Sequence, residues 1–70
     1  MNATTSSGPD VIVVNQGSIF LFHLHTQAAK AWVSQNVEDG AQYFGGALVV
    51  EHRYARDLVA RMLADGLLVT

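Results

Sequence analysis

The sequence predicts one small α+β domain, in which a mostly antiparallel sheet carries two helices in the order β-β-α-β-β-α-β. Short runs of β-branched and aromatic residues flank glycine-containing turns, a pattern typical of β-hairpins. Two longer segments repeat their apolar residues at about 100° per residue, which indicates amphipathic helices. The length of 70 residues allows a single core, because domains of about this size bury only about 60% of the surface that the unfolded chain exposes.

The first predicted element is a hairpin that follows a polar tail. Residues 1–9 show no apolar period, so we expect a frayed N-terminal tail and a single domain over residues 10–70. Residues 11–14 and 18–24 then flank Asn15-Gln16-Gly17. A three-residue loop that ends in glycine is typical of a turn followed by a bulge, and it predicts that these two segments pair.

A helix is predicted next, beginning after Thr26, whose hydroxyl can accept a hydrogen bond from the first turn. The helix should end near Asn36, and an acidic turn, Glu38-Asp39-Gly40, follows it. Its apolar residues gather on one side of the helical wheel: Ala28, Ala29, Trp32 and Val33.

Two glycines make the second hairpin. Residues 42–44 and 47–50 are short apolar runs on either side of Gly45-Gly46. Glycine tolerates the positive φ angles that a two-residue hairpin turn requires. A phosphate-binding loop would instead need a Gly-Lys-Ser/Thr ending, which the sequence lacks here.

The second helix has the strongest amphipathic pattern, and the stretch Glu51-His52-Arg53-Tyr54 is interpreted as its beginning. The helix should close at Asp65-Gly66, with residues 67–70 as a last short strand. Apolar residues fill one half of the wheel: Tyr54, Ala55, Leu58, Val59, Met62 and Leu63. The other half carries Arg53, Arg56, Asp57 and Arg61.

Alternation along the second strand points Ile19 and Leu21 to one face of the sheet and Phe20 and Phe22 to the other. Both faces are therefore apolar. We expect the helices to flank both faces; the alternative is that a second protein chain covers one of them. One cluster between sheet and helices is predicted to contain Phe20, Phe22, Trp32, Leu58 and Met62.

The sequence offers little catalytic or metal chemistry. His23 and His25 share one face of an extended strand, a spacing that can chelate a metal, and His52 is the only other histidine. No cysteine and no well-placed carboxylate completes such a site, so we expect no metal and no cofactor. Ser18 and Ser34 lack the motif of a catalytic nucleophile. The prediction is a protein that is not an enzyme.

Charge and hydropathy narrow the class further. The net charge of −2 does not indicate nucleic-acid binding. The N-terminus has no basic and apolar signal pattern, and runs such as residues 47–50 are far short of the roughly 20 residues of a membrane span. We therefore expect a cytoplasmic protein. An alternative function remains open: a small regulatory or antitoxin-like module that binds DNA or a partner through Arg53, Arg56 and Arg61.

Two stretches, GSIFLFHLHTQAAKAWVSQNV and AQYFGGALVVEHRYARDLVARMLADGL, resemble small bacterial and mobile-element proteins. Within that set the chain is most similar to the anti-CRISPR proteins of the type I-C inhibitor group, from about Asp10 to Thr70. The most specific parts of the resemblance are Phe44-Gly45-Gly46-Ala47 and Glu51-His52-Arg53-Tyr54.

The resemblance implies a non-catalytic phage or mobile-element product that acts in the host bacterial cytoplasm. Such proteins bind a subunit of the CRISPR surveillance complex (Cascade) and block recognition of target DNA, many of them as DNA mimics with acidic surfaces. We expect no direct contact with nucleic acid and no membrane, while self-association stays open. The residues expected to bind the partner are Glu38, Asp39, Asp57 and Asp65.

Overall fold

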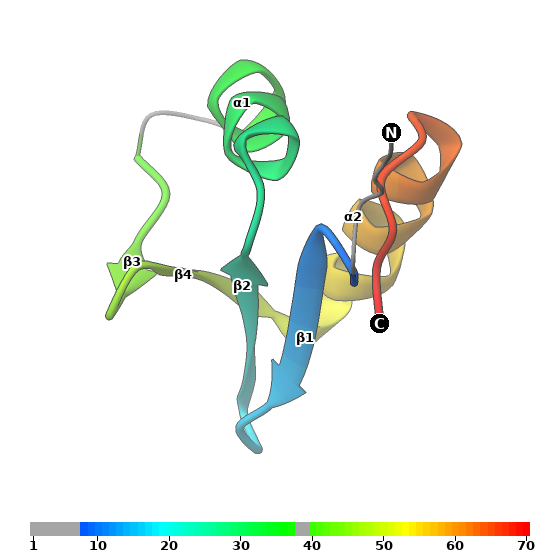
Figure 1. Cartoon of the computed structure of the whole chain (residues 1–70). Coiled ribbons are helices and arrows are strands. Elements are labelled where there is room, and N and C mark those ends of the chain that lie inside the picture. Colours follow the sequence, from blue (N-terminus) through cyan, green and yellow to red (C-terminus); the bar gives the residue numbers. More distant parts are fainter. Residues whose placement is uncertain (1–7, 38–39) are drawn as a thin grey trace, which may run out of the picture.

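The computed structural model describes residues 8–37 and 40–70 (Figure 1). Its elements are β1 (Val11–Asn15), β2 (Ile19–Leu24), α1 (Gln27–Asn36), β3 (Tyr43–Phe44), β4 (Ala47–Glu51) and α2 (His52–Ala64). The strands form one antiparallel sheet in the spatial order β1-β2-β4-β3. The predicted α+β class is confirmed.

Both predicted hairpins form at their glycines. In the first, Gly17 has φ 93°, and its N–H donates to Asn15 Oδ1 at 2.8 Å. In the second, Gly45 and Gly46 both have positive φ, 57° and 85°, as a two-residue hairpin turn requires. Side chains with a Cβ rarely adopt these angles, so the glycines serve the turns.

The two helices cover the same face of the sheet, and the expectation that they flank both faces is wrong. Phe22 pairs with Val13 on one side and with Leu48 on the other, so the three share a face. Buried residues of both helices join that face in one cluster, among them Trp32 of α1 and Met62 of α2. The predicted core is confirmed: Phe22, Trp32 and Met62 are buried in this cluster, and Phe20 and Leu58 pack against it, half-buried.

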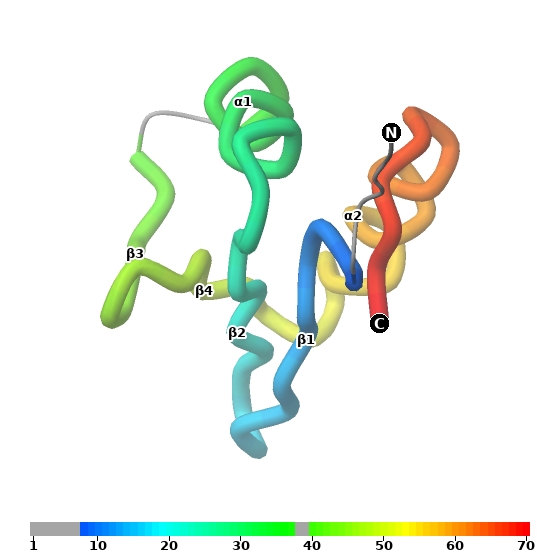
Figure 2. Tube along the Cα trace, in the orientation of Figure 1, coloured from blue at the N-terminus to red at the C-terminus, as the bar shows by residue number. Residues whose placement is uncertain are grey.

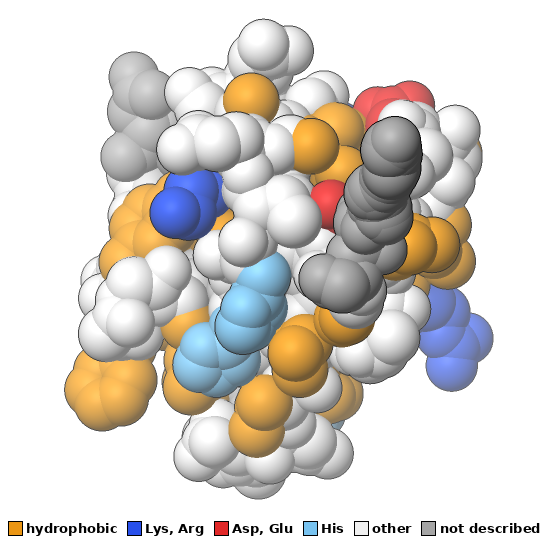
Figure 3. Space-filling view, viewed as in Figure 1, with side chains coloured by type: hydrophobic (Ala, Val, Ile, Leu, Met, Phe, Trp, Pro, Cys, Tyr) orange, Lys and Arg blue, Asp and Glu red, His pale blue; other side chains and the backbone are white. Residues whose placement is uncertain are grey.

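In the part of the chain that the structure describes, no helix packs on the opposite face of the sheet. In the register of the strands, Leu21 lies between Val14 and Val49 on this face, with Ile12 and His23 as the next pair. We call these five residues the open face. Figure 3 shows apolar side chains along the strands there, with imidazoles between them. The buried residues of both helices instead belong to the same cluster as Phe22, on the other face.

The C-terminal residues differ from the predicted last strand. They form an isolated parallel bridge, Val11 to Val69, along the outer edge of β1. The Val11 N–H donates to the Leu68 carbonyl at 3.0 Å, and the Thr70 N–H donates to the Val11 carbonyl at 3.1 Å. Figure 2 shows the start of β1 beside this end of the chain. The segment is too short for a strand of its own, yet it satisfies backbone groups at that edge.

Asp10 joins three segments of the fold. Its Oδ2 accepts the Leu68 N–H at 2.9 Å, and its Oδ1 accepts the Thr26 hydroxyl at 2.7 Å. Thr26 in turn accepts the Ala29 N–H at 3.1 Å, which confirms the predicted cap of α1. Asp10 therefore holds the C-terminal segment and the start of α1 together.

Asp10→Asn should reduce the stability of the protein near neutral pH and flatten its acid dependence. The Leu68 N–H, and then the Thr26 hydroxyl, lower the pKa of Asp10. A carboxylate with a lowered folded pKa stabilises the fold above its unfolded pKa and loses that effect as pH falls through the folded value. The parent should therefore lose stability below about pH 4, and the variant should lose less over that range. Melting temperatures by circular dichroism between pH 2 and 7 measure both; parallel curves for the two proteins would contradict the role of Asp10.

Candidate interaction groove

A groove of about 610 Å³ lies between the C-terminal end of α1, β4 and α2. Its volume falls in the range of about 300–1,000 Å³ that ligand pockets occupy. The apolar part of its lining comes from β4, from α2 and from the chain on both sides of residues 38–39: Val37, Ala41, Leu48, Val49, Val50 and Leu58. The polar part consists of Asn36, Glu51, Tyr54, Asp57 and Arg61.

The first turn of α2 forms a connected polar cluster at the rim. Arg53 Nε donates to Glu51 Oε1 at 3.3 Å, and the Arg53 guanidinium lies 5.0 Å from the centre of the Tyr54 ring. These side chains are exposed, Tyr54 at 56%. Their contacts hold them in place only weakly, because an exposed ion pair contributes little to stability. The cluster gives the groove an aromatic and charged border that faces solvent.

The sequence did not predict this cluster as a site, since Glu51-His52-Arg53-Tyr54 was interpreted only as the beginning of a helix. That interpretation is confirmed, because α2 begins at His52 with Glu51 as its cap residue. A useful signal was present in the sequence: a strand passes directly into a helix there, so the side chains at the junction lie at one edge of the sheet.

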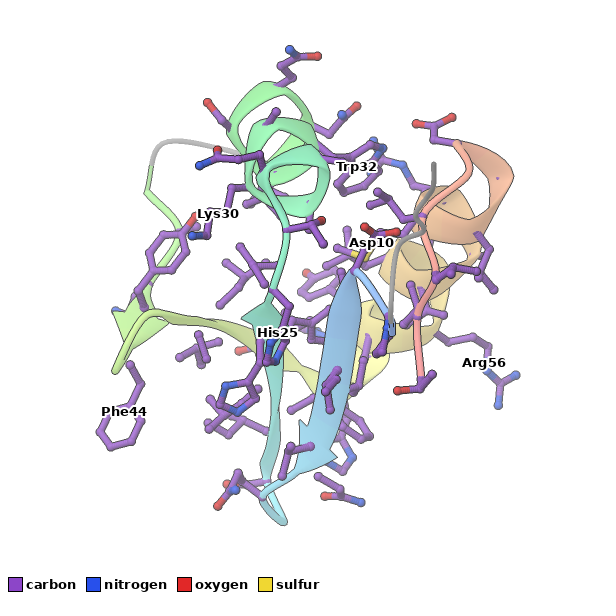
Figure 4. All side chains as sticks on the ribbon, in the orientation of Figure 1. Asp10, His25, Lys30, Trp32, Phe44 and Arg56 are labelled. Carbon is purple, nitrogen blue, oxygen red and sulfur yellow. The ribbon has the colours of Figure 1, made fainter. Side chains whose placement is uncertain are left out.

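Trp32 contacts two polar residues near the C-terminal end of α2, Arg61 and the cap residue Asp65. Its Nε1–H donates to Asp65 Oδ2 at 2.6 Å, and the Arg61 guanidinium lies 5.7 Å from its ring centre. In Figure 4 Trp32 reaches from α1 toward α2. Asp57, in contrast, lines the groove and makes no hydrogen bond with Trp32. In residues 8–37 and 40–70 the one ion pair is that between Arg53 and Glu51, so the i,i+4 spacing of Asp57 and Arg61 does not produce one.

The predicted acidic residues are therefore not all placed together. Glu38 and Asp39 lie outside the described residues, but their sequence neighbours Val37 and Gly40 line the same groove as Asp57. Asp65 caps the end of α2, bonds to Trp32 and does not line the groove. Within the part of the chain that the structure describes, Asp57 is the predicted acid that belongs to the groove.

The arginines of α2 do not form an unbroken basic surface. Arg53 is engaged by Glu51 and Tyr54, and Arg61 lies over Trp32. Arg56 is exposed and extends away from the molecule in Figure 4. The three side chains are thus divided between different neighbours, which does not favour a helix that reads DNA.

The histidines are split between the two faces of the sheet. The rings of His23 and His25 are 6.4 Å apart, centre to centre, whereas His52 stacks on Phe20 at 4.4 Å on the helix-covered side. His52 therefore cannot be a third ligand to an ion held by the other two. Among the described residues no group of three or more possible metal ligands occurs.

We predict that untagged protein carries no stoichiometric zinc. Two imidazoles leave at least one position of a tetrahedral site to be filled by a further protein ligand. Elemental analysis after dialysis without chelator gives the zinc content per chain. One zinc per chain that disappears in the His23→Ala and His25→Ala variants would show that the prediction is wrong.

No known protein family, curated protein or solved structure matches this chain. No helix within the described ranges is long and apolar enough to cross a membrane. On the structural side, a proposal of function therefore rests on the geometry of the groove.

Proposed function

We propose that this protein is a non-catalytic inhibitor that binds the type I-C CRISPR surveillance complex in the bacterial cytoplasm and blocks recognition of target DNA. The observation that carries the proposal is the exposed Glu51–Arg53–Tyr54 cluster at the rim of the groove. These residues belong to one of the most specific parts of the resemblance to the type I-C inhibitor group.

The residue types at the rim suit a protein partner. Tyrosine and arginine are enriched among the residues that contribute most to protein–protein binding. An apolar floor with a polar border also has the anatomy of a protein interface. The described lining holds no serine, threonine, cysteine or histidine, and its two carboxylates, Glu51 and Asp57, are exposed.

Acidic residues supply the proposed steering toward the complex. Asp57 lines the groove, and the acidic pair Glu38-Asp39 lies in the sequence between Val37 and Gly40, which also line it. Carboxylates would be attracted over long range by a basic DNA-binding surface and then hold its Lys or Arg side chains through charge-assisted hydrogen bonds.

Capture of the purified type I-C complex on the immobilised protein, followed by a DNA-binding assay on the captured complex, tests the proposal. We expect capture and a loss of target-DNA binding. The double variant Glu38→Lys/Asp39→Lys should capture less complex, and the deficit should be larger at low salt, where charge repulsion is screened least. Asp57→Lys should behave in the same way.

Two outcomes would contradict the proposal. One is the absence of capture; the other is capture of a complex that still binds target DNA normally. Binding of duplex DNA by the protein alone, lost in Arg56→Glu, would support the regulatory module instead. Circular dichroism tests whether each variant is folded. For the exposed positions Arg56 and Asp57 we expect a folded protein, because exposed substitutions usually change stability by less than about 0.5 kcal/mol.

A further inference from the structure

The groove is an apolar trough whose described lining carries two carboxylates, Glu51 and Asp57. Leu48 and Val50 of β4 are almost fully buried, at 1% and 7% exposure, and they form the floor together with the half-buried Leu58 of α2. Asp57 precedes Leu58 in α2 and is exposed. An occupant of this trough would meet methyl groups below it and a negative charge beside it.

The other charged groups of the groove have partners already. Glu51 accepts a hydrogen bond from Arg53. The Arg61 guanidinium lies over Trp32, which does not line the groove. The Asp57 carboxylate takes part in no hydrogen bond or ion pair with the described residues, 8–37 and 40–70. In the described lining, Asp57 is thus the carboxylate that no described cation pairs with, whereas the guanidinium of the lining, Arg61, lies over an aromatic ring.

We propose that the groove receives an arginine side chain of the partner protein. The methylene stem would lie on Leu58 and Val50, and the guanidinium would donate two hydrogen bonds to the Asp57 carboxylate. Long basic side chains bury their stems on apolar surface while keeping the charged group at its edge. The planar guanidinium can donate two parallel hydrogen bonds to the two oxygens of a carboxylate. A lysine ammonium cannot make this paired arrangement.

The exposed Tyr54 ring offers a further reason to expect a guanidinium. The Arg53 guanidinium already lies 5.0 Å from the centre of that ring. The ring therefore makes a cation–π contact with a guanidinium in the free protein. A partner arginine can approach the ring from the groove, where Tyr54 is part of the lining. This inference names the chemistry of the partner at the same surface, and it rests on the proposed function only for the identity of that partner.

Three blocked tripeptides serve as probes: acetyl-Leu-Arg-Leu-amide, the matched Leu-Lys-Leu peptide and the neutral Leu-Gln-Leu peptide. Each is titrated into 15N-labelled protein at low salt while backbone amide shifts are recorded. We expect saturable shifts at residues 48–58, with the tightest binding by the arginine peptide. Asp57→Asn should weaken that binding about two- to fivefold, the range expected for loss of an exposed ion pair, and should leave the glutamine peptide unaffected. Asp65→Asn is the control, because Asp65 lies outside the groove.

The inference is wrong if the three peptides bind equally, if the shifts map elsewhere, or if no peptide binds. Its outcome is separable from that of the proposed function. Capture of the surveillance complex without a preference for arginine would leave the proposed function standing and remove this inference. An arginine preference that depends on Asp57, found in a protein that captures no complex, would do the reverse.

Discussion

Phe22→Ala should lower the free energy of unfolding at 25 °C by about 3–5 kcal/mol. Phe22 is fully buried, and it lies in the centre of the sheet between Val13 and Leu48. Removing a buried Phe side chain typically costs 3–5 kcal/mol. A domain of this length is worth roughly 4–10 kcal/mol in total, at about 0.05–0.15 kcal/mol per residue. The substitution would therefore cancel much or all of the stability, as urea unfolding followed by circular dichroism will show.

Leu21→Ala is the matched control for this prediction. Leu21 is the neighbour of Phe22 in β2 and is only 7% exposed, but it belongs to the open face and not to the core cluster. Its loss should be tolerated better, because no helix within residues 8–37 and 40–70 packs on that side. If Leu21→Ala proved more destabilising than Phe22→Ala, the assignment of the core to the helix-covered face would be wrong.

Tyr54→Ala should weaken binding to the surveillance complex about 30-fold or more and abolish inhibition at moderate concentration. Truncating an aromatic residue that dominates an interface costs about 2 kcal/mol or more, and every 1.4 kcal/mol corresponds to a tenfold change in affinity. Biolayer interferometry with the immobilised complex measures the affinity directly. This prediction rests on the proposed function.

Tyr43→Ala provides a closely matched control. Tyr43 is 53% exposed, almost the same as Tyr54, but it lies in β3 and does not line the groove. It should bind the complex as well as the parent does. Equal losses in both variants, or a loss in Tyr43→Ala alone, would move the interface from the groove to the second hairpin, where Phe44 is also exposed.

The local elements of this fold could be predicted from the sequence, because local interactions determine them. The glycines at positions 17, 45 and 46 require particular turns, and Thr26 caps the helix that follows it. The amphipathic pattern correctly placed Trp32 and Met62 on the buried sides of their helices. It was wrong for Ala28, Tyr54 and Leu63, which are exposed at the edges of those sides.

The relation between the elements could not be predicted in the same way. The alternation of side chains along β2 predicts that both of its faces are apolar. It does not indicate which face the two helices cover. The pairing of β4 with β2 likewise depends on contacts between distant residues. The candidate site had the same difficulty: Glu51, Tyr54 and Asp57 become one surface only when β4, α2 and the end of α1 meet. The hydrogen bond between Trp32 and Asp65 could not be predicted either, because the two residues are 33 positions apart in the sequence.

The bridge between the C-terminal segment and β1 has a consequence for the order of folding. The Leu68 N–H and the Asp10 carboxylate are 58 residues apart in the sequence, so closing this contact early would cost much chain entropy. The two hairpins need only short loops and can form first. During that interval the outer edge of β1 has no neighbour, and an unpaired strand edge is a site for pairing with another chain. We therefore expect residues 67–70 to pair with β1 late in folding. Once in place, they occupy the outer edge of β1 and prevent it from pairing with another chain.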